Sequence, residues 1–300
     1  MDNRVPARGG QIGNPKDYTD IICPLMAGED SVFQTTAGVV PRPGVELYYE
    51  VTGSGPAIVF AHGLGGNHQS WWQQVPYFAQ RHTCVAFAHR GFAPSFTGPN
   101  PDPALYIDDL AALIDHLGLS SVNLVAQSMG GWSCLEYTLR HPDRVKNLVL
   151  AATSGTVDLS TLDPPENRAM DQWYAAHMMV NEELFRRGIH PAAGERMAHE
   201  QPALHFLYRE IDRLSSRVDK NALRGKLAAM RTVPVSRLKD IRTPVLFIAG
   251  DEDVVFPPAA AAALAAVVPG AKLERVAEAG HSVYFERAAL FNELVSSFLG

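Results

Sequence analysis

The most informative segment of this chain is Val122-Asn123-Leu124-Val125-Ala126-Gln127-Ser128-Met129-Gly130-Gly131-Trp132. It begins as an apolar run typical of a β-strand, and a helical pattern starts directly after the serine. A sharp strand-to-helix turn of this kind lifts one side chain clear of its surroundings, as in a nucleophile elbow. The strained turn crowds the positions two before and two after the serine, which hold the small residues Ala126 and Gly130. The segment therefore predicts that the Ser128 side chain stands free at the end of a strand.

Short apolar runs alternate with helical patterns on both sides of this segment. Strands are expected over residues 45–51, 57–61, 82–88, 122–126, 145–151, 245–249 and 272–276. Helices are expected over residues 105–117, 129–140, 257–269 and 290–299. Several strand runs are continuously apolar, as in strands covered on both faces. The alternation predicts an α/β fold with a mostly parallel sheet and helices on both faces.

The pattern divides the chain into three parts. Residues 1–36 are rich in Gly, Pro, Asp and Asn without periodicity, and we interpret them as an irregular N-terminal arm. Residues 37–153 and 240–300 carry the alternation and form the expected core. Residues 154–239 show helical spacing and no clear strand, and they are too many for a simple loop. We expect them to form an inserted helical cap, or lid, over the carboxyl ends of the strands, where open α/β folds bind ligands.

A serine hydroxyl needs a positioned base to become a nucleophile, and that base needs a third group to orient it. His281 follows the expected strand 272–276, and Asp253 follows the expected strand 245–249 within Gly250-Asp251-Glu252-Asp253. We predict that Ser128, Asp253 and His281 are the catalytic residues. Asp251 remains the alternative acid.

Four motifs in this order make the chain resemble the α/β-hydrolase superfamily over residues 38–300. They are Phe60-Ala61-His62-Gly63-Leu64-Gly65-Gly66, the serine elbow, the Gly-x-x-Asp of residues 250–253, and Gly280-His281. The resemblance implies a sheet of eight strands, with Ser128 as nucleophile, His281 as general base and then acid, and Asp253 as the orienting carboxylate.

The resemblance also implies an oxyanion hole formed by the backbone N–H groups of Leu64 and Met129. His62 would shape that loop. One segment departs from the family pattern: His89-Arg90-Gly91-Phe92-Ala93-Pro94-Ser95 stands where relatives commonly carry Asp-x-Arg-Gly-x-Gly-x-Ser. Either the loop packs differently here, or His89 alters the charge near the pocket.

The composition limits the partners and the location of the protein. The net charge is -6, from 26 basic and 32 acidic residues, which argues against nucleic acid or an anionic membrane as partner. No segment approaches the roughly 18 unbroken apolar residues of a membrane span, and the N-terminus lacks a secretory pattern. A cytoplasmic location is therefore expected.

Cysteine and histidine spacing gives no sign of a metal site. Cys23, Cys84 and Cys134 form no Cys-x-x-Cys pair, and the last two lie in apolar runs that predict buried free thiols. His62 and His68 share a glycine-rich loop without a carboxylate or cysteine cluster nearby. We expect neither a metal nor another cofactor.

The expected activity is acyl transfer to water by an enzyme. A serine nucleophile argues against the related dehalogenases and epoxide hydrolases, which use a carboxylate. We expect a serine esterase or lactonase cleaving a small-to-medium, largely apolar carboxylic ester or lactone. A C–C bond hydrolase of a vinylogous diketone (a dienone acid) would use the same triad, and a ligand receptor on this fold is an alternative of a different class. The expected partner is a small-molecule substrate, and a homodimer stays open.

Candidate pocket residues come from the cap and from the oxyanion loop. Trp173, Tyr174, His177 and Met178 could line an apolar pocket with a few polar groups. His62 and Trp71 lie in or just beyond the oxyanion loop. Each could instead serve core packing or hold the cap on the body. The cap shows no basic cluster in its sequence, which argues against a multiply anionic substrate.

Overall fold

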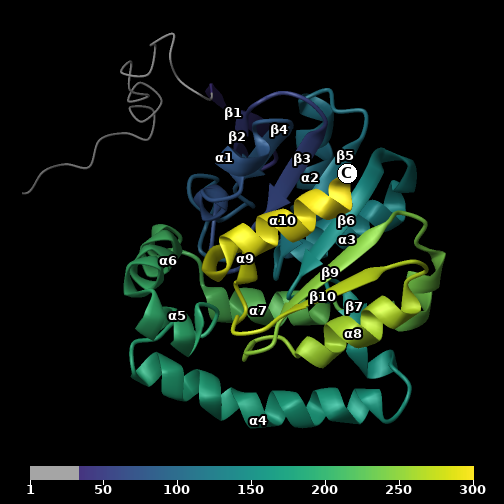
Figure 1. The fold of residues 1–300 in the computed structure, drawn as a ribbon. Helices are drawn as coiled ribbons and strands as arrows, with labels where there is room; N and C mark the ends of the chain where they lie inside the picture. Colours follow the sequence, from purple (N-terminus) through teal and green to yellow (C-terminus); the bar gives the residue numbers. More distant parts are fainter. Residues whose placement is uncertain (1–33) are drawn as a thin grey trace, which may run out of the picture. The chain divides into compact units, whose positions relative to one another are not determined.

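The computed structural model describes residues 34–300. Eight strands form one sheet in the order β1-β2-β4-β3-β5-β6-β9-β10 (Figure 1). Their bounds are β1 Thr35–Arg42, β2 Val45–Thr52, β3 Ala57–Ala61, β4 Thr83–Phe87, β5 Val122–Gln127, β6 Val145–Ala151, β9 Val245–Gly250 and β10 Lys272–Val276. The β1–β2 and β2–β4 pairs are antiparallel and all other neighbours are parallel. The expected α/β fold with a mostly parallel eight-stranded sheet is confirmed.

Strand β1 is the strand of the eight-stranded sheet that the sequence pattern did not reveal. It begins at Thr35, inside the segment 1–36 interpreted as an arm, and it pairs along its whole length with β2. Its sequence includes Gly38 and Pro41, residues that weaken a strand signal and that sheets tolerate at an edge. The rest of the expected arm, residues 1–33, lies outside the described residues.

The sheet is buried on both faces because successive apolar side chains of its central strands point to opposite faces. In β3, Ala57, Val59 and Ala61 belong to one core cluster, together with side chains of α2, α3 and α8. Phe60 points the other way, and its ring lies 5.1 Å from that of Trp71 and 6.1 Å from that of Phe78 in α1. The helices flanking the sheet are α1 Val75–Phe78, α2 Tyr106–His116, α3 Gly130–Arg140, α8 Pro258–Val267, α9 Val283–Glu286 and α10 Ala288–Leu299.

Residues 154–239, hereafter the helical segment, interrupt the alternation between β6 and β9. They contain α4 Glu166–Arg186, α5 Gly194–Glu200, α6 Pro202–Leu214 and α7 Lys220–Ala229, drawn in green in Figure 1. Two very short strands, β7 Val157–Asp158 and β8 Val233–Pro234, pair in parallel near the ends of this segment, where the sequence pattern showed no strand. None of the described helices is long and apolar enough to cross a membrane.

The register of the parallel strands brings three loops to one edge of the sheet. Ala61 of β3 lies opposite Ala126 of β5, and Gln127 lies opposite Ala151 of β6. The residues that follow these strands therefore leave the sheet side by side. This places the segment after β3 beside Ser128, which directly follows β5.

Candidate active site

Ser128 occupies a strained turn between β5 and α3. Its φ angle is +47°, in the left-handed region that costs a non-glycine residue about 1–2 kcal/mol. Its backbone N–H donates to the carbonyl oxygen of Ala151 at 2.9 Å, which ties the turn to β6. The residues on either side are buried, whereas Ser128 keeps solvent contact. The turn has the geometry expected of a nucleophile elbow.

The small residues around Ser128 are required by close backbone contacts. A Cβ atom added to Gly130 would lie 2.2 Å from the carbonyl oxygen of Ala61, in the neighbouring strand β3. A Cβ atom added to Gly131 would lie 2.5 Å from Oγ1 of Thr153. Helix α3 can therefore approach the sheet this closely only because its first two residues lack side chains.

His281 and Asp253 form a buried pair at the ends of the following strands. Nδ1 of His281 lies 2.8 Å from Oδ2 of Asp253, and the two residues are each 3% exposed. The other carboxylate oxygen, Oδ1, accepts from the backbone N–H groups of Val255 at 2.7 Å and Phe256 at 2.9 Å. Asp251 instead accepts from Nε of Arg275 on the surface. The structure thus brings Asp253, not Asp251, to the histidine.

The loop that carries His281 is held from two sides. Nε2 of Gln127, the residue before the serine, donates to the carbonyl oxygen of His281 at 3.3 Å. The backbone N–H of Gly280 donates to Oε2 of Glu286 at 2.7 Å. Burial raises the pKa of Glu286, and the Gly280 hydrogen bond opposes that shift. These contacts fix the histidine relative to the serine turn.

His62 is a buried structural residue of the loop after β3. Its Nδ1–H donates to the carbonyl oxygen of Gly63 at 2.8 Å, and its Nε2 accepts from the backbone N–H of His89 at 3.0 Å. Burial lowers the pKa of His62 to about 3, so the ring is neutral. Two hydrogen bonds therefore set both its tautomer and the course of the oxyanion loop.

His89 also packs in the interior. Its ring lies 4.6 Å from that of His62, and Nε2 lies 3.1 Å from Oγ of Ser133. Burial first, and then the neighbouring His62, hold its pKa well below the ordinary value. His89 is thus a neutral residue that packs in the interior, so it adds no charge near the pocket.

The predicted oxyanion amides lie next to the serine. Met129 is the cap residue of α3, where backbone N–H groups lack partners within the helix. Among residues 34–300, the N–H groups of Leu64 and Met129 donate to no other residue. Such free donors at a helix start favour negative charge.

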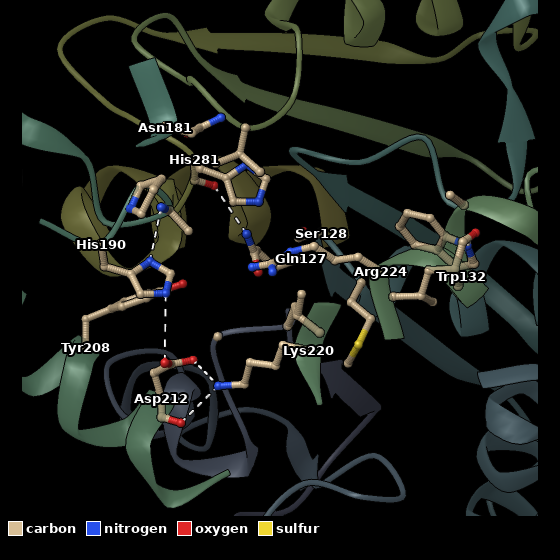
Figure 2. A pocket seen from close by; sticks show the side chains of 18 of the residues that line it. Gln127, Ser128, Trp132, Asn181, His190, Tyr208, Asp212, Lys220, Arg224 and His281 are labelled. Atoms are coloured by element: carbon tan, nitrogen blue, oxygen red, sulfur yellow. Dashed lines mark hydrogen bonds and ion pairs between the residues drawn. The ribbon is translucent and has the colours of Figure 1, made fainter. Parts of the chain in front are cut away.

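A cavity of about 390 Å³ brings these groups together. Ser128, His281, Leu64 and Met129 all line it, and Figure 2 shows Ser128, Gln127 and His281 facing residues of the helical segment across it. The remaining lining residues are Gly65, Gln127, Trp132, Asn181, Phe185, His190, Pro191, Ala192, Tyr208, Asp212, Lys220, Arg224, Leu227, Ala228, Arg231 and Val255.

The six residues predicted to line the pocket lie outside this lining. His62 and Trp71 are fully buried in the body, and the Trp71 ring packs 4.6 Å from that of Tyr284. Trp173 and His177 stack on each other at 3.9 Å along α4, and Met178 is 63% exposed. The buried Tyr174 hydroxyl lies behind the lining, close to the guanidinium of Arg231; burial raises its pKa and that guanidinium opposes the shift.

Helix α4 contributes Asn181 and Phe185 instead, one and two turns beyond His177. Three cationic residues also line the cavity, Lys220, Arg224 and Arg231. Sequence reasoning missed them because they are not adjacent in the sequence and form no basic run. Their separations of four and seven residues would place them on one helical face, which is the signal that could have found them.

The part of the chain that the structure describes holds no group of three His, Cys, Asp or Glu side chains placed to bind a metal ion. Cys84 and Cys134 are buried and free, and burial raises the pKa of each thiol to about 12. Cys23 lies outside the described residues.

Comparisons of this chain with family models, known sequences and solved structures all point to one family. A model of the family described as alpha/beta hydrolase fold matches residues 56–288. The chain is 28% identical to "Putative carbamate hydrolase RutD" of Caulobacter vibrioides over 275 residues, which are 84% of this chain and 95% of the relative. It is also 28% identical to "Putative 2-succinyl-6-hydroxy-2,4-cyclohexadiene-1-carboxylate synthase" of Bacillus subtilis, over 88% of this chain and 98% of the relative.

Solved structures include a close match to the whole described body. Est816, described as an N-acyl homoserine lactone degrading enzyme, superimposes with a TM-score of 0.70 at 28% identity. The match covers 87% of this chain and 99% of that protein.

Proposed function

Since the chain belongs to the α/β-hydrolase fold family, we propose that it is a serine hydrolase that cleaves a small-to-medium carboxylic ester or lactone. One observation carries the proposal: Nδ1 of His281 is bonded to Asp253 at 2.8 Å, beside a cavity that Ser128 also lines. With Nδ1 held by the carboxylate, Nε2 is the nitrogen left to exchange a proton. A general base next to a strained, accessible serine is the arrangement that acyl transfer needs.

The reaction then proceeds through an acyl-enzyme. Ser128 Oγ attacks the substrate carbonyl carbon while His281 Nε2 accepts the hydroxyl proton, and the new oxyanion accepts from the N–H groups of Leu64 and Met129. The carbon–oxygen bond to the alcohol breaks, and His281 returns the proton to the leaving oxygen. Water repeats the sequence on the acyl-enzyme, which releases the acid and restores Ser128.

Two of the three reported relatives, each 28% identical to this chain, support the kind of bond, whereas the equally similar Bacillus relative is named a putative synthase. Est816 is described as degrading an N-acyl homoserine lactone, and the Caulobacter relative is named a carbamate hydrolase. Both names describe acyl carbons bound to a heteroatom, which favours an ester or lactone substrate over a carbon–carbon bond. We also propose that the helical segment, residues 154–239, acts as the lid, because it supplies most of the cavity wall.

The test combines active-site labelling with a substrate panel. A fluorophosphonate should add once to the wild-type protein, at Ser128 by peptide mass spectrometry, and should not add to Ser128→Ala. Ser216→Ala, at an exposed position outside the cavity, is the matched control and should label fully. The same three proteins are then assayed on esters, lactones and dienone acids.

Turnover of an ester or lactone that disappears only in Ser128→Ala supports the proposal. Turnover of a dienone acid alone would replace it with carbon–carbon bond hydrolysis. A folded wild-type protein that neither labels nor turns over any substrate would refute it and favour a receptor.

A further inference from the structure

The cavity above Ser128 carries an excess of positive charge. Lys220, Arg224 and Arg231 line it, whereas Asp212 is the one carboxylate in its lining, so three cations less one anion leave two positive charges. His190 adds none at neutral pH, because burial lowers its pKa to about 4. An apolar substrate alone would gain nothing from these charges.

Lys220 and Asp212 neutralise each other. Nζ of Lys220 donates to Oδ1 of Asp212 and to the backbone carbonyl oxygen of the same residue, and Figure 2 shows this pair beside His190. The pair joins α7 to α6 and is satisfied without a ligand. The two uncompensated charges are therefore the guanidinium groups of Arg224 and Arg231.

Neither arginine forms an ion pair within residues 34–300. Arg224 is exposed on the cavity side of α7 and donates to the side-chain oxygen of Asn221 at 2.8 Å, a neutral partner; desolvation lowers its pKa. Among residues 34–300, Nε of Arg231 is buried without a hydrogen-bond partner, and the Tyr174 hydroxyl lies close to the guanidinium. A buried donor left unpaired is costly, and a ligand that supplies an acceptor removes that cost.

The setting of Arg231 holds its guanidinium in one orientation. Its central carbon lies 5.1 Å from the ring centroid of Trp132, within reach of a cation–π interaction. Trp132 is fixed in turn, because its Nε1–H donates to the carbonyl oxygen of Leu227 at 2.9 Å. A guanidinium held over a fixed ring keeps its N–H groups available to a carboxylate, which it can bind through two parallel hydrogen bonds.

We infer that Arg224 and Arg231 form an anion subsite, and that the substrate of Ser128 is an ester or lactone carrying a free carboxylate. This inference rests on the proposed function and specifies its substrate class. The carboxylate binds at the α7 side of the cavity while the scissile carbonyl lies at Ser128. The rest of the substrate lies against apolar lining such as Leu64, Met129 and Val255.

The test compares each anionic substrate with its neutral match. Monomethyl esters of linear dicarboxylic acids, from succinate to suberate, are paired with the same esters whose free carboxylate is a primary amide. From the binding free energy of a charged hydrogen bond, we expect kcat/KM for at least one acid to exceed that for its amide by about ten- to a hundredfold. In Arg224→Gln and Arg231→Gln the ratio should fall toward one, mainly through KM for the acid. Arg217→Gln, whose guanidinium lies over Phe96 outside the cavity, should keep the wild-type ratio.

Two further readouts separate this inference from the proposed function. Fluorophosphonate labelling of every variant reports the reactivity of Ser128 itself. Calorimetric titration of Ser128→Ala with the dicarboxylates, alone and combined with each arginine substitution, reports binding without turnover.

A protein that labels and turns over esters with ratios near one in all variants would overturn the subsite and leave the hydrolase proposal standing. A protein that does not label, yet binds a dicarboxylate only when both arginines are present, would keep the subsite and refute the hydrolase. Absence of labelling, turnover and dicarboxylate binding would refute both.

Discussion

Replacing Asp253 with asparagine tests how the site sets the tautomer of His281. Oδ1 of Asp253 accepts from the backbone N–H groups of Val255 and Phe256 at 2.7 and 2.9 Å. Only the oxygen of an asparagine amide can take over that role, so its NH₂ group must face Nδ1 of His281. Nδ1 then becomes an acceptor, and the histidine proton moves to Nε2.

A proton on Nε2 removes the base that Ser128 needs. In a serine protease, the equivalent substitution of the triad aspartate by asparagine produces the wrong histidine tautomer and lowers turnover by about 10⁴. That factor corresponds to about 5.4 kcal/mol of barrier, at 1.36 kcal/mol for each tenfold change. We expect Asp253→Asn to lower kcat for a p-nitrophenyl ester by a similar factor, with the circular dichroism spectrum unchanged because both backbone hydrogen bonds remain.

Asp251→Asn is the matched control, two residues away on the surface and paired with Arg275. It should retain kcat within about twofold, since exposed ion pairs contribute little. If Asp253→Asn kept more than a tenth of the activity while Asp251→Asn lost most of it, the tautomer argument and the choice of acid would both fail.

Three other substitutions or conditions test the fold around the site. The pKa of His62 is about 3 in the folded protein against 6.5 in the unfolded chain, so the unfolded state binds more protons between these pH values. Acidification from pH 6.5 to 5 should therefore lower the unfolding free energy by about 2 kcal/mol for this residue. Urea titrations at the two pH values measure the change. In the wild-type protein, Arg90 donates two hydrogen bonds of 2.6 Å to the carboxylate of Asp109. Asp109→Asn leaves this buried guanidinium without a carboxylate and should lower the unfolding free energy by about 3–5 kcal/mol in the same assay. Gly130→Ala drives a Cβ atom to within 2.2 Å of the Ala61 carbonyl oxygen, so fluorophosphonate labelling should slow and the thermal midpoint should fall.

The two substitutions each have a matched comparison. Asp115→Asn breaks the solvated pair with Arg144 and should cost less than about 1 kcal/mol. Gly225→Ala, on α7 with no atom within 4 Å of the added Cβ, should leave labelling unchanged. An unfolding free energy independent of pH from 7 to 5 would contradict the burial of His62. Equal losses of unfolding free energy in Asp109→Asn and Asp115→Asn would contradict the burial of the Arg90–Asp109 pair.

The serine turn is predictable from sequence because its signal is local, whereas the histidine–aspartate contact is predicted from the order of the motifs along the chain. A strand, a serine between small residues and a helix predict a sharp turn, and Gly130 lacks a side chain because the backbone of β3 lies so close to it. The same is true of the strands, whose continuous apolar runs reflect burial on both faces. Strand β1 escaped notice because an edge strand accepts Gly38 and Pro41.

The cavity wall is not predictable in this way. Helix α4 carries apolar and polar residues along its whole length, Glu166–Arg186, so periodicity identifies a face but not the turn that reaches the cavity. The turn with Asn181 and Phe185 does, and the turn with Trp173 and His177 does not. Arg224 and Arg231 likewise look like an ordinary solvated helix face until tertiary packing places Trp132 against one of them.

The proposed reacting residues and most of the cavity wall come from different stretches of the chain. Ser128, Asp253 and His281 follow strands of the sheet, whereas Lys220, Arg224 and Leu227 lie on one helix of the inserted segment. Mutations accumulating on α7 therefore alter what is recognised without disturbing the backbone that aligns the nucleophile. Under the proposed function, mutations on one helix can change the substrate preference while the residues at the strand ends stay the same.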